Sequence, residues 1–281
     1  MGVPGELARC DMLTAITRAV SPAFARCELS FIEREPIDLA QARSEHHSYA
    51  ALLEKLGARV VSLPEEPELP DSMFVEDPAI VLDEVAIICP LGTETRRKEA
   101  PSIAAALAPF RKLAYITLPG TLEGGDVLRV GRQLFVGVTR RSNPEGIRQL
   151  ASIVHAYGYE LTAVPVSGCL HLKSAVTLLG ANTLLGNRAW FDWNRMAGFE
   201  WVDAHPTEPH SGNALQIGGT VVFPAAYPRT AELIREKGFK VALLDISELQ
   251  KAESGLTCSS LLFEARKKSP ESLPSAPPLR S

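Results

Sequence analysis

Residues 126–138 read DVLRVGRQLFVGV, two β-forming runs on either side of a turn at Gly131-Arg132. A helix is expected next, because Asn143 is a good N-cap residue and Pro144 suits the first helical position. The chain then returns to a strand-like run, YELTAVPV, at residues 159–166. This stretch therefore predicts one α/β unit made of a hairpin, a helix and a further strand.

The same order of elements recurs before and after this stretch. The preceding copy consists of AIVLDEVAIICP at residues 79–90, a helix from Arg96 to about Phe110, and KLAYITLP at residues 112–119. Two copies follow, with hairpins at 171–187 and 213–224 and closing strands at 200–205 and 240–246. The N-terminal segment supplies a strand at 12–20, a helix from Asp38 to Leu56 and a strand at 58–63, and the run CSSLLFEA at 258–265 is left to pair with it.

The starts of these units are regularly spaced along the chain. They fall at Asp77, Asp126, His171, Asn213 and Cys258, with spacings of 49, 45, 42 and 45 residues. Such a period predicts repeated units arranged around an axis or along a solenoid. If the last strand completes the first unit, the result is a closed, five-bladed, pseudo-symmetric α/β propeller. A conventional two-layer α/β domain is the alternative.

The composition is that of an ordinary globular protein of 281 residues, with 46% hydrophobic residues, 22% charged residues and a net charge of -4. This mildly acidic composition does not indicate binding to nucleic acid or to an anionic membrane. No apolar run approaches the roughly 20 residues of a membrane span. The five scattered cysteines argue against a disulfide framework and a structural zinc site, so we expect a cytoplasmic protein. We predict a single domain over residues 1–266 and a disordered, Ser- and Pro-rich tail over residues 267–281.

Equivalent positions in a ring lie at the same end of it, so residues at the unit starts should converge. This brings Cys258 level with His171, and a cysteine beside a histidine forms a nucleophile with its proton shuttle. The alternative for Cys258 is a small buried core residue. His46 and His47 lie outside the unit starts, and we expect them on a solvated helix face. His210, near the fourth unit start, is a less favoured candidate than His171 for the catalytic histidine.

Acidic residues gather in two motifs, PDSMFVEDP at residues 70–78 and TLEGGD at residues 121–126. Aspartate and glycine favour turns, which is the structural alternative. As carboxylates at the mouth of a ring, they would instead match the five N–H donors of a planar guanidinium. Arg96 and Arg141, if they enter the mouth, would capture a substrate carboxylate. Together these residues predict an amino-acid substrate with a cationic side chain.

Six motifs, in the order PDSMFVEDP, ETRRKE, TLEGGD, RSNPEG, HLK and GLTCSSL, resemble the dimethylarginine dimethylaminohydrolase family of the guanidino-modifying superfamily. The resemblance runs from Leu13 to Glu264. It implies the pentein type of five-bladed propeller, with no metal and no organic cofactor. It also implies hydrolysis of N(omega)-methylated L-arginine to L-citrulline and an alkylamine through a covalent thiouronium on Cys258.

The resemblance assigns roles to ten positions. Cys258 is implied as the nucleophile, His171 as general acid and base, and Glu123 as their supporting carboxylate. The implied substrate contacts are Asp77 with Glu76 and Asp71 around the guanidinium, Arg96 and Arg141 on the α-carboxylate, and Leu29 and Ala252 on the α-amino group. One departure is the loop KAESGLTC, where Glu253-Ser254 replaces the usual Asp-Gly. It falls at the implied α-amino end of the substrate, where losing the glycine can alter a turn.

Other functions remain open on the same residues. An arginine deiminase would release ammonia, although those enzymes usually carry a helical insertion that this sequence lacks. An amidinotransferase would pass the amidino group to an amine, and a catalytically silent protein would only bind arginine. A cysteine peptidase would leave the acidic motifs unexplained. In each of the first three cases the partner is a small arginine derivative, and the chain is expected to be a monomer or homodimer.

Overall fold

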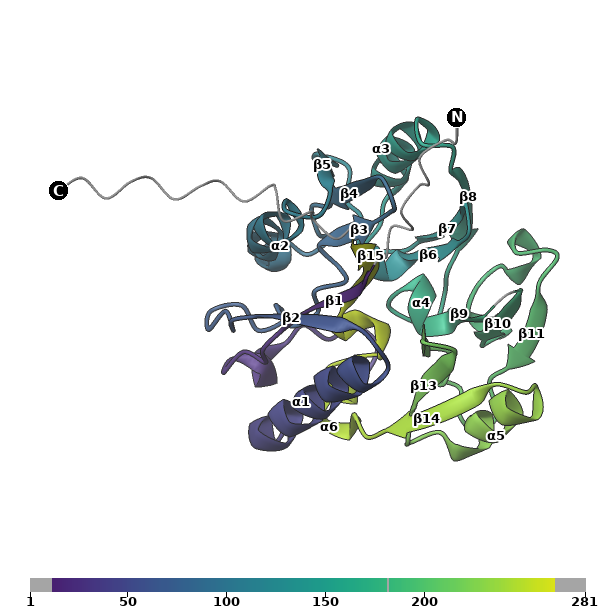
Figure 1. The fold of residues 1–281 in the computed structure, drawn as a ribbon. Helices are drawn as coiled ribbons and strands as arrows, with labels where there is room; N and C mark the ends of the chain where they lie inside the picture. The colour runs from purple at the N-terminus through teal and green to yellow at the C-terminus, as the bar shows by residue number, and fades with distance from the viewer. Residues whose placement is uncertain (1–11, 181, 266–281) are drawn as a thin grey trace, which may run out of the picture.

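The computed structural model describes residues 12–180 and 182–265, so the expected C-terminal tail lies outside the described residues. Within them the chain forms five three-stranded sheets around a central axis (Figure 1). In chain order the sheets are β3 (Ala79–Val81), β4 (Val85–Ile88) and β5 (Lys112–Tyr115); β6 (Val127–Val130), β7 (Gln133–Val138) and β8 (Glu160–Pro165); β9 (Val176–Gly180), β10 (Thr183–Gly186) and β11 (Glu200–Asp203); β12 (Leu215–Ile217), β13 (Thr220–Pro224) and β14 (Lys240–Leu244); and β15 (Leu261–Ala265), β1 (Met12–Arg18) and β2 (Arg59–Leu63).

Every sheet repeats one pairing pattern. The middle strand pairs antiparallel with the inner strand and parallel with the outer strand. A parallel pair needs a crossover connection, which is usually helical. The crossovers contain α1 (Leu39–Lys55), α2 (Ala100–Leu107), α3 (Pro144–His155) and α5 (Pro228–Glu236), while the third unit has two 3-10 turns at Arg188–Trp190 and Trp193–Arg195.

Local signals explain where these helices begin. The Asp38 side chain caps α1 by accepting from the N–H groups of Ala40 and Gln41. Asn143 caps α3 by accepting from Gly146. The expected helix from Arg96 is different, because residues Glu94–Glu99 form a 3-10 helix and α2 starts only at Ala100.

The ring closes through the C-terminal strand. β15 pairs antiparallel with β1, from Met12 opposite Ala265 to Ile16 opposite Leu261. The last strand therefore completes the first unit, as the period predicted. The five-bladed propeller is confirmed, and the two-layer alternative is wrong.

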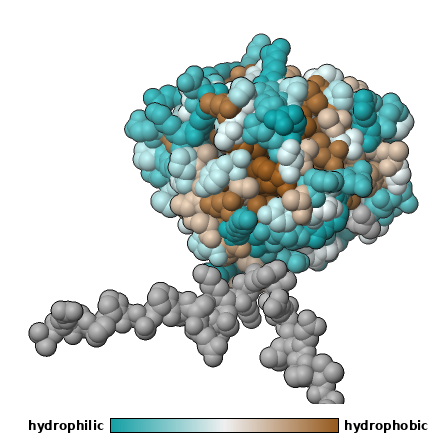
Figure 2. Space-filling view, turned by 90° about the horizontal axis from the view of Figure 1, so that it is seen from above, coloured by the Kyte–Doolittle hydropathy of each residue, from teal (hydrophilic) through white to brown (hydrophobic). Residues whose placement is uncertain are grey.

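Apolar clusters join neighbouring blades. One cluster unites Ile16 and Phe263 of the closing blade with Ala86 of β4 and Ile103 of α2. Figure 2 shows polar side chains over much of one outer face, with apolar residues gathered near its middle. No helix among the described residues is long and apolar enough to cross a membrane.

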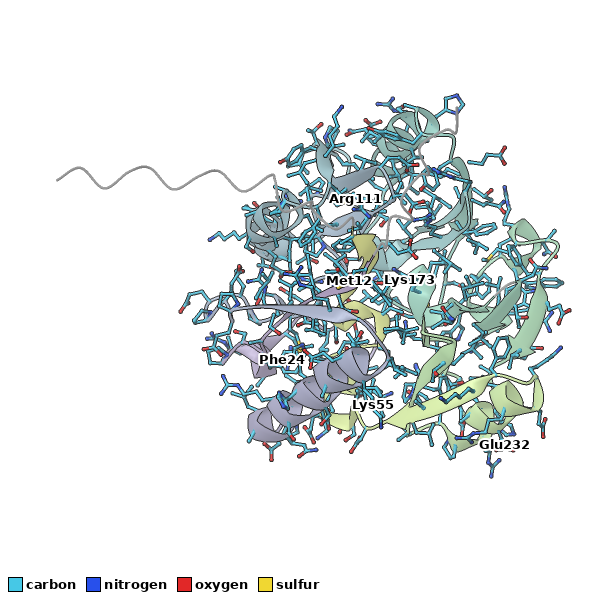
Figure 3. All side chains as sticks on the ribbon, in the orientation of Figure 1. Met12, Phe24, Lys55, Arg111, Lys173 and Glu232 are labelled. Carbon is cyan, nitrogen blue, oxygen red and sulfur yellow. The ribbon has the colours of Figure 1, made fainter. Side chains whose placement is uncertain are left out.

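The inner strands β3, β6, β9, β12 and β15 line a well of about 290 Å³ at one end of the axis. Lys173 also lines this well and lies near the middle of the ring (Figure 3). The chemically interesting side chains lie beyond it, in the short turns that precede the inner strands.

Candidate active site

Turns and short helices before the inner strands bring distant residues together. His171 is the N-cap residue of α4 (Leu172–Ala175), and Cys258 lies in a 3-10 helix at Thr257–Ser259. With Asp77, which precedes β3, they line one cavity. The full lining is Glu28, Asp71, Phe74, Asp77, Arg96, Arg141, Leu170, His171, Ala252, Glu253, Ser254 and Cys258.

His171 and Glu123 form a buried ion pair, with 2.6 Å between Nε2 and Oε2. Burial alone would lower the pKa of His171, but the charges of Asp77 and Glu123 outweigh it and raise this pKa to about 9. Burial alone would raise the pKa of Glu123, but its hydrogen bond to His171 lowers it to about 2. At neutral pH the pair is therefore an imidazolium and a carboxylate, so His171 holds a proton that it can donate.

Cys258 lies in an environment that disfavours the thiolate. Burial and then the charges of Glu76 and Asp77 raise the pKa of its thiol to about 12. The N–H of Gly255 lies 3.4 Å from Sγ and offsets only part of this shift. A cation brought beside the sulfur would favour the thiolate by direct Coulomb attraction. The geometry therefore suits a nucleophile that becomes active when a cationic substrate arrives.

Asp77 has one occupied and one open oxygen. Its Oδ2 accepts from Nη1 of Arg96 at 2.9 Å. Its Oδ1 is buried, has no hydrogen-bond partner among the described residues, and lies 4.0 Å from Nε2 of His171. A buried carboxylate oxygen without a donor is costly, so a cationic N–H donor placed there would be strongly bound.

Asp77, Glu123 and His171 also form a group whose ligand atoms lie within 4.8 Å of one another, as metal ligands do. The hydrogen bond between His171 and Glu123 already uses two of these atoms. The His171 pKa of about 9 also opposes metal binding, since a metal ligand must be a neutral imidazole. The arrangement favours proton transfer, and the expectation of no metal stays a prediction.

Arg96 and Arg141 are both buried at the cavity wall but have different partners. Nε and Nη2 of Arg96 each donate to Glu99 at 3.0 Å, in addition to the bond with Asp77. Arg141 donates instead to the hydroxyl groups of Thr93 and Ser30, and its Nη1 lies 3.5 Å from a Glu123 oxygen. Hydroxyl partners are neutral, so a carboxylate can replace them more readily than it can replace Glu99.

Two of the remaining implied contacts line the cavity. Asp71 accepts the N–H of Glu28 at 3.2 Å, and burial raises the pKa of its carboxyl group. Ala252 is also part of the lining. The side chain of Leu29 is not in that lining and packs against the apolar cluster that contains Ala252.

Glu76 does not face the reaction cavity. Its Oε2 accepts from Oγ1 of Thr257 at 2.8 Å, its Oε1 pairs with Lys173, and it lines the well at the opposite end of the axis. Both oxygens are thus occupied by the protein. Glu76, paired with Lys173, therefore contacts the 3-10 helix of Cys258 through its hydrogen bond to Thr257.

Asp126 and Gly125 have supporting positions behind the site. Asp126 was expected among the carboxylates at the mouth of the ring, but it does not line the cavity, and Gly125 had no assigned role. Asp126 is fully buried and accepts from Ser142 at 2.6 Å and from the N–H of Leu172 at 2.9 Å, which holds the start of α4 behind His171. A Cβ on Gly125 would lie 2.7 Å from Nδ1 of His171, so only glycine fits there without movement. In the sequence, the run GGD at residues 124–126 was the signal for these two supporting positions.

The other histidines contact different surroundings. His46 is buried, and burial lowers its pKa to about 4, so the expectation of a solvated helix face is wrong for His46 and holds for the exposed His47. His210 lies in a neighbouring pocket with Trp190, at a ring-centroid distance of 4.9 Å. It does not line the cavity of Cys258.

Comparisons with known proteins identify the family of this chain. The sequence model of the family "N,N dimethylarginine dimethylhydrolase, eukaryotic" matches residues 27–183. A dimethylarginine dimethylaminohydrolase of Pseudomonas aeruginosa is 34% identical over 228 residues, covering 80% of this chain and 90% of that protein. One of Streptomyces coelicolor is 35% identical over 248 residues, covering 88% and 95%. The chain belongs to the dimethylarginine dimethylaminohydrolase family.

Solved structures of dimethylarginine dimethylaminohydrolases share the fold closely. An adduct of a variant with S-methyl-L-thiocitrulline superposes with a TM-score of 0.86 at 31% identity, covering 90% of this chain and all of that one. A cysteine-to-serine variant of the Pseudomonas aeruginosa enzyme, in complex with citrulline, gives a TM-score of 0.84 at 31% identity and the same coverage. The N-terminal domain of the cyanobacterial arginine dihydrolase ArgZ shares the fold alone, with a TM-score of 0.81 at 18% identity.

Proposed function

We propose that this family member hydrolyses N(omega)-methylated L-arginine to L-citrulline and an alkylamine, with Cys258 as the nucleophile. The observation that carries the proposal is the buried Oδ1 of Asp77, which has no hydrogen-bond partner among the described residues and lies in the same cavity as the Cys258 thiol and the His171 imidazolium. That oxygen fits one N–H of a guanidinium. The sulfur and the imidazolium then lie beside the carbon to be attacked and the amine to be released.

The first half of the reaction transfers the amidino carbon to sulfur. When the substrate guanidinium binds at Asp77, its positive charge lowers the pKa of the Cys258 thiol, whose proton leaves to solvent. The thiolate attacks the guanidinium carbon and forms a C–S bond. His171 donates its proton to the methylated nitrogen, the C–N bond breaks, and the alkylamine departs, leaving a thiouronium on Cys258.

The second half restores the enzyme. His171, now neutral, takes a proton from a water molecule, and the resulting hydroxide attacks the thiouronium carbon. Collapse of this adduct breaks the C–S bond while its hydroxyl proton passes to the departing sulfur, which restores the Cys258 thiol and releases citrulline. Glu123 stabilises the imidazolium in both halves through its 2.6 Å hydrogen bond. These steps use protein side chains and water alone, consistent with an enzyme that needs no cofactor.

The rest of the substrate is held at the outer part of the cavity. Arg141 is the better-placed cation for the α-carboxylate because its hydrogen-bond partners are hydroxyl groups, while Arg96 contributes its charge and fixes Asp77. Asp71, which the resemblance places near the guanidinium, accepts the N–H of Glu28 next to Leu29. We therefore assign it, with the segments at Leu29 and Ala252, to the α-amino end. Glu76 acts indirectly, by holding Thr257 next to the nucleophile.

The enclosed space of the cavity is about 20 Å³, room for about one water molecule. An arginine derivative therefore enters only if the segment around Glu28 and Ser30, which contacts Asp71 and Arg141, moves aside. We also propose a cytoplasmic location, because the four cysteines within the described part of the chain, at 27, 89, 169 and 258, form no disulfide there. The chain is proposed to be a monomer or homodimer.

The experiment is to incubate the protein separately with asymmetric dimethylarginine, monomethylarginine and arginine, and to assay citrulline and the released amine. The proposal predicts citrulline with dimethylamine or methylamine from the first two. Citrulline with ammonia from arginine alone would instead identify a deiminase. No citrulline from any of the three would contradict the proposal.

A further inference from the structure

Glu253 has an unusual backbone. Within residues 12–180 and 182–265 it is the one non-glycine residue with positive φ, at 58°. Side chains other than glycine rarely adopt this conformation, and such outliers gather at ligand clamps and active sites. The left-handed residue of this turn is therefore Glu253 itself, and Ser254 takes an ordinary conformation.

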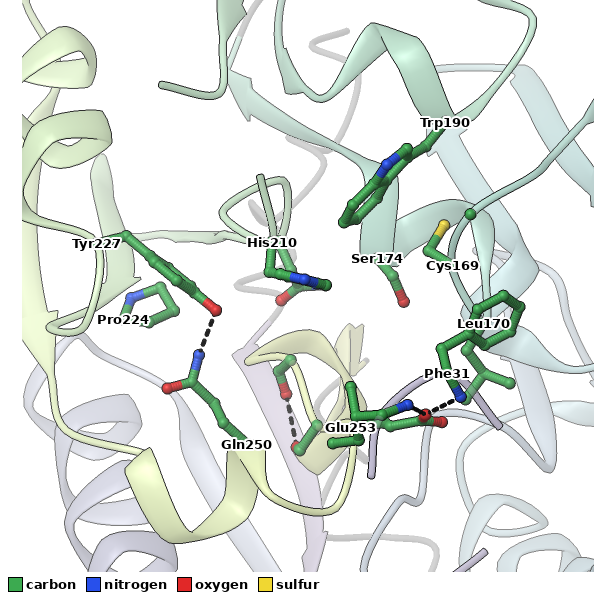
Figure 4. Close-up of a pocket in the computed structure, with 15 residues that line it drawn as sticks. Phe31, Cys169, Leu170, Ser174, Trp190, His210, Pro224, Tyr227, Gln250 and Glu253 are labelled. Carbon is green, nitrogen blue, oxygen red and sulfur yellow. Dashed lines mark hydrogen bonds between the residues drawn. The ribbon is translucent and has the colours of Figure 1, made fainter. Parts of the chain in front are cut away.

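The carboxylate of Glu253 holds the segment 28–32, of which Glu28 lines the reaction cavity. Its Oε1 accepts from the N–H groups of Ser30 at 3.0 Å and Ile32 at 2.9 Å, and also from Phe31. Successive backbone N–H groups that converge in this way form an anion-binding nest. Figure 4 shows Glu253 directed at Phe31 in the neighbouring pocket of Trp190 and His210. Glu253 also lines the reaction cavity.

The second oxygen of Glu253 has no such donor. Oε2 is buried and unpartnered among the described residues, and the residue lines the reaction cavity beside Ala252. A buried carboxylate oxygen of this kind is strongly stabilised by a charged N–H donor.

Glu253 also lies next to the cation assigned to the α-carboxylate. Ser30 links them, because its N–H donates to Glu253 and its hydroxyl accepts from Nη2 of Arg141 at 3.2 Å. An α-amino acid carries its ammonium and carboxylate on one carbon, so it needs an anion and a cation close together. Glu253 and Arg141, on either side of Ser30, provide that pair.

We propose that Glu253 is a specificity-determining residue that couples recognition of the substrate's α-ammonium group to closure of the segment 28–32. Oε1 holds the segment over the cavity, and Oε2 accepts from the ammonium. One carboxylate thus serves both closure of the segment and recognition of the substrate. A substrate without the ammonium group leaves Oε2 of Glu253 without a hydrogen-bond donor. This inference rests on the proposed function, because it takes the substrate to be an α-amino acid.

The test compares asymmetric dimethylarginine with its des-amino analogue, in which hydrogen replaces the α-ammonium group. Glu253→Gln keeps an oxygen for the segment 30–32 but places an amide where the ammonium would bind. We expect kcat/KM for dimethylarginine to fall at least about tenfold, mainly through KM, and to change little for the analogue. Glu253→Asp keeps the charge and should retain most of the preference for the α-amino acid.

Glu248→Gln is the matched control, because Glu248 likewise accepts a backbone N–H of the N-terminal segment, from Asp38 at 2.8 Å, but outside the cavity. It should leave both substrates unaffected. Equal losses for both substrates in Glu253→Gln would overturn the inference while leaving the proposed function intact. If the wild type turns over neither substrate, the proposed function fails, and calorimetric binding of L-citrulline against des-amino citrulline then gives the same comparison.

Hydrogen exchange tests closure without turnover. Glu253→Ala removes both oxygens, so the amides of residues 30–32 should exchange at least about tenfold faster than in the wild type and in Glu248→Ala. The thermal midpoint and circular dichroism establish that the variant is folded. Unchanged exchange at these three amides would contradict the role of Glu253 in holding the segment.

Discussion

At the scale of single residues, burial and three carboxylates decide the state of the site. Asp77 and Glu123 keep His171 protonated, while burial and then the charges of Glu76 and Asp77 raise the pKa of Cys258. The resting site is therefore a thiol beside an imidazolium. In the proposed mechanism, Cys258 stays protonated until a cationic substrate brings the charge that stabilises the thiolate.

Asp77→Asn should have opposite effects on thiol reactivity and on turnover. Removing the negative charge lowers the pKa of Cys258, so alkylation by iodoacetamide at pH 8 should become several-fold faster. Turnover should fall at least about a hundredfold, because the guanidinium loses its acceptor. Mass spectrometry of the modified cysteine gives the alkylation rate, and Asp83→Asn, an exposed turn residue, is the control. Slower alkylation in Asp77→Asn would contradict this account of the Cys258 pKa.

The His171 pKa also predicts how stability changes with pH. Because the folded-state pKa of about 9 lies above the ordinary 6.5, the contribution is fully present below pH 6.5 and is lost as the pH rises through about 9. The difference in unfolding free energy between wild type and His171→Gln should therefore shrink by up to about 3 kcal/mol across this interval. Urea titrations at pH 6 and pH 10 measure it. A difference that stays constant would show that the pKa is not raised.

At the scale of elements, the short turns before the inner strands determine how closely the side chains of the site pack against one another. Gly125→Ala places a methyl group against His171 and the open oxygen of Asp77. We expect kcat to fall at least about tenfold, because the imidazole is displaced. Gly158→Ala is the control, since Gly158 has φ 74° with open space around its Cβ and should lose only about 1 kcal/mol of stability. Equal kcat values for the two variants would contradict the close fit at Gly125.

The helices, the strands and the convergence of the turns before the inner strands could be predicted from the sequence. Several side-chain contacts between these elements could not. The caps at Asp38 and Asn143 are local signals, so the corresponding helix starts could be predicted. The pairing of Glu76 with Lys173 depends on two turns 97 residues apart meeting in space, and no local pattern specifies it. The left-handed Glu253 likewise depends on its contact with a segment more than 200 residues away.

At the scale of the whole molecule, closure by β15 predicts that the ring unfolds as one cooperative unit. Phe263 of β15 packs edge-on against Phe110 at a centroid distance of 5.4 Å, whereas all three tryptophans, at 190, 193 and 201, lie in or near the third blade. Phe263→Ala should destabilise the protein by about 3–5 kcal/mol and shift tryptophan fluorescence and circular dichroism together. Leu243→Ala, at an exposed strand position, should change stability by about 0.5 kcal/mol or less. An unshifted fluorescence transition in Phe263→Ala would mean that the blades unfold independently.

The central claim is that Cys258 carries the amidino group during turnover. The most direct measurement is the intact mass of the protein after mixing with asymmetric dimethylarginine and rapid quenching in acid. We expect a mass increase equal to the substrate less dimethylamine, located on the peptide that contains Cys258 and absent from Cys258→Ser. Citrulline production without that adduct, or undiminished turnover by Cys258→Ser, would contradict the account.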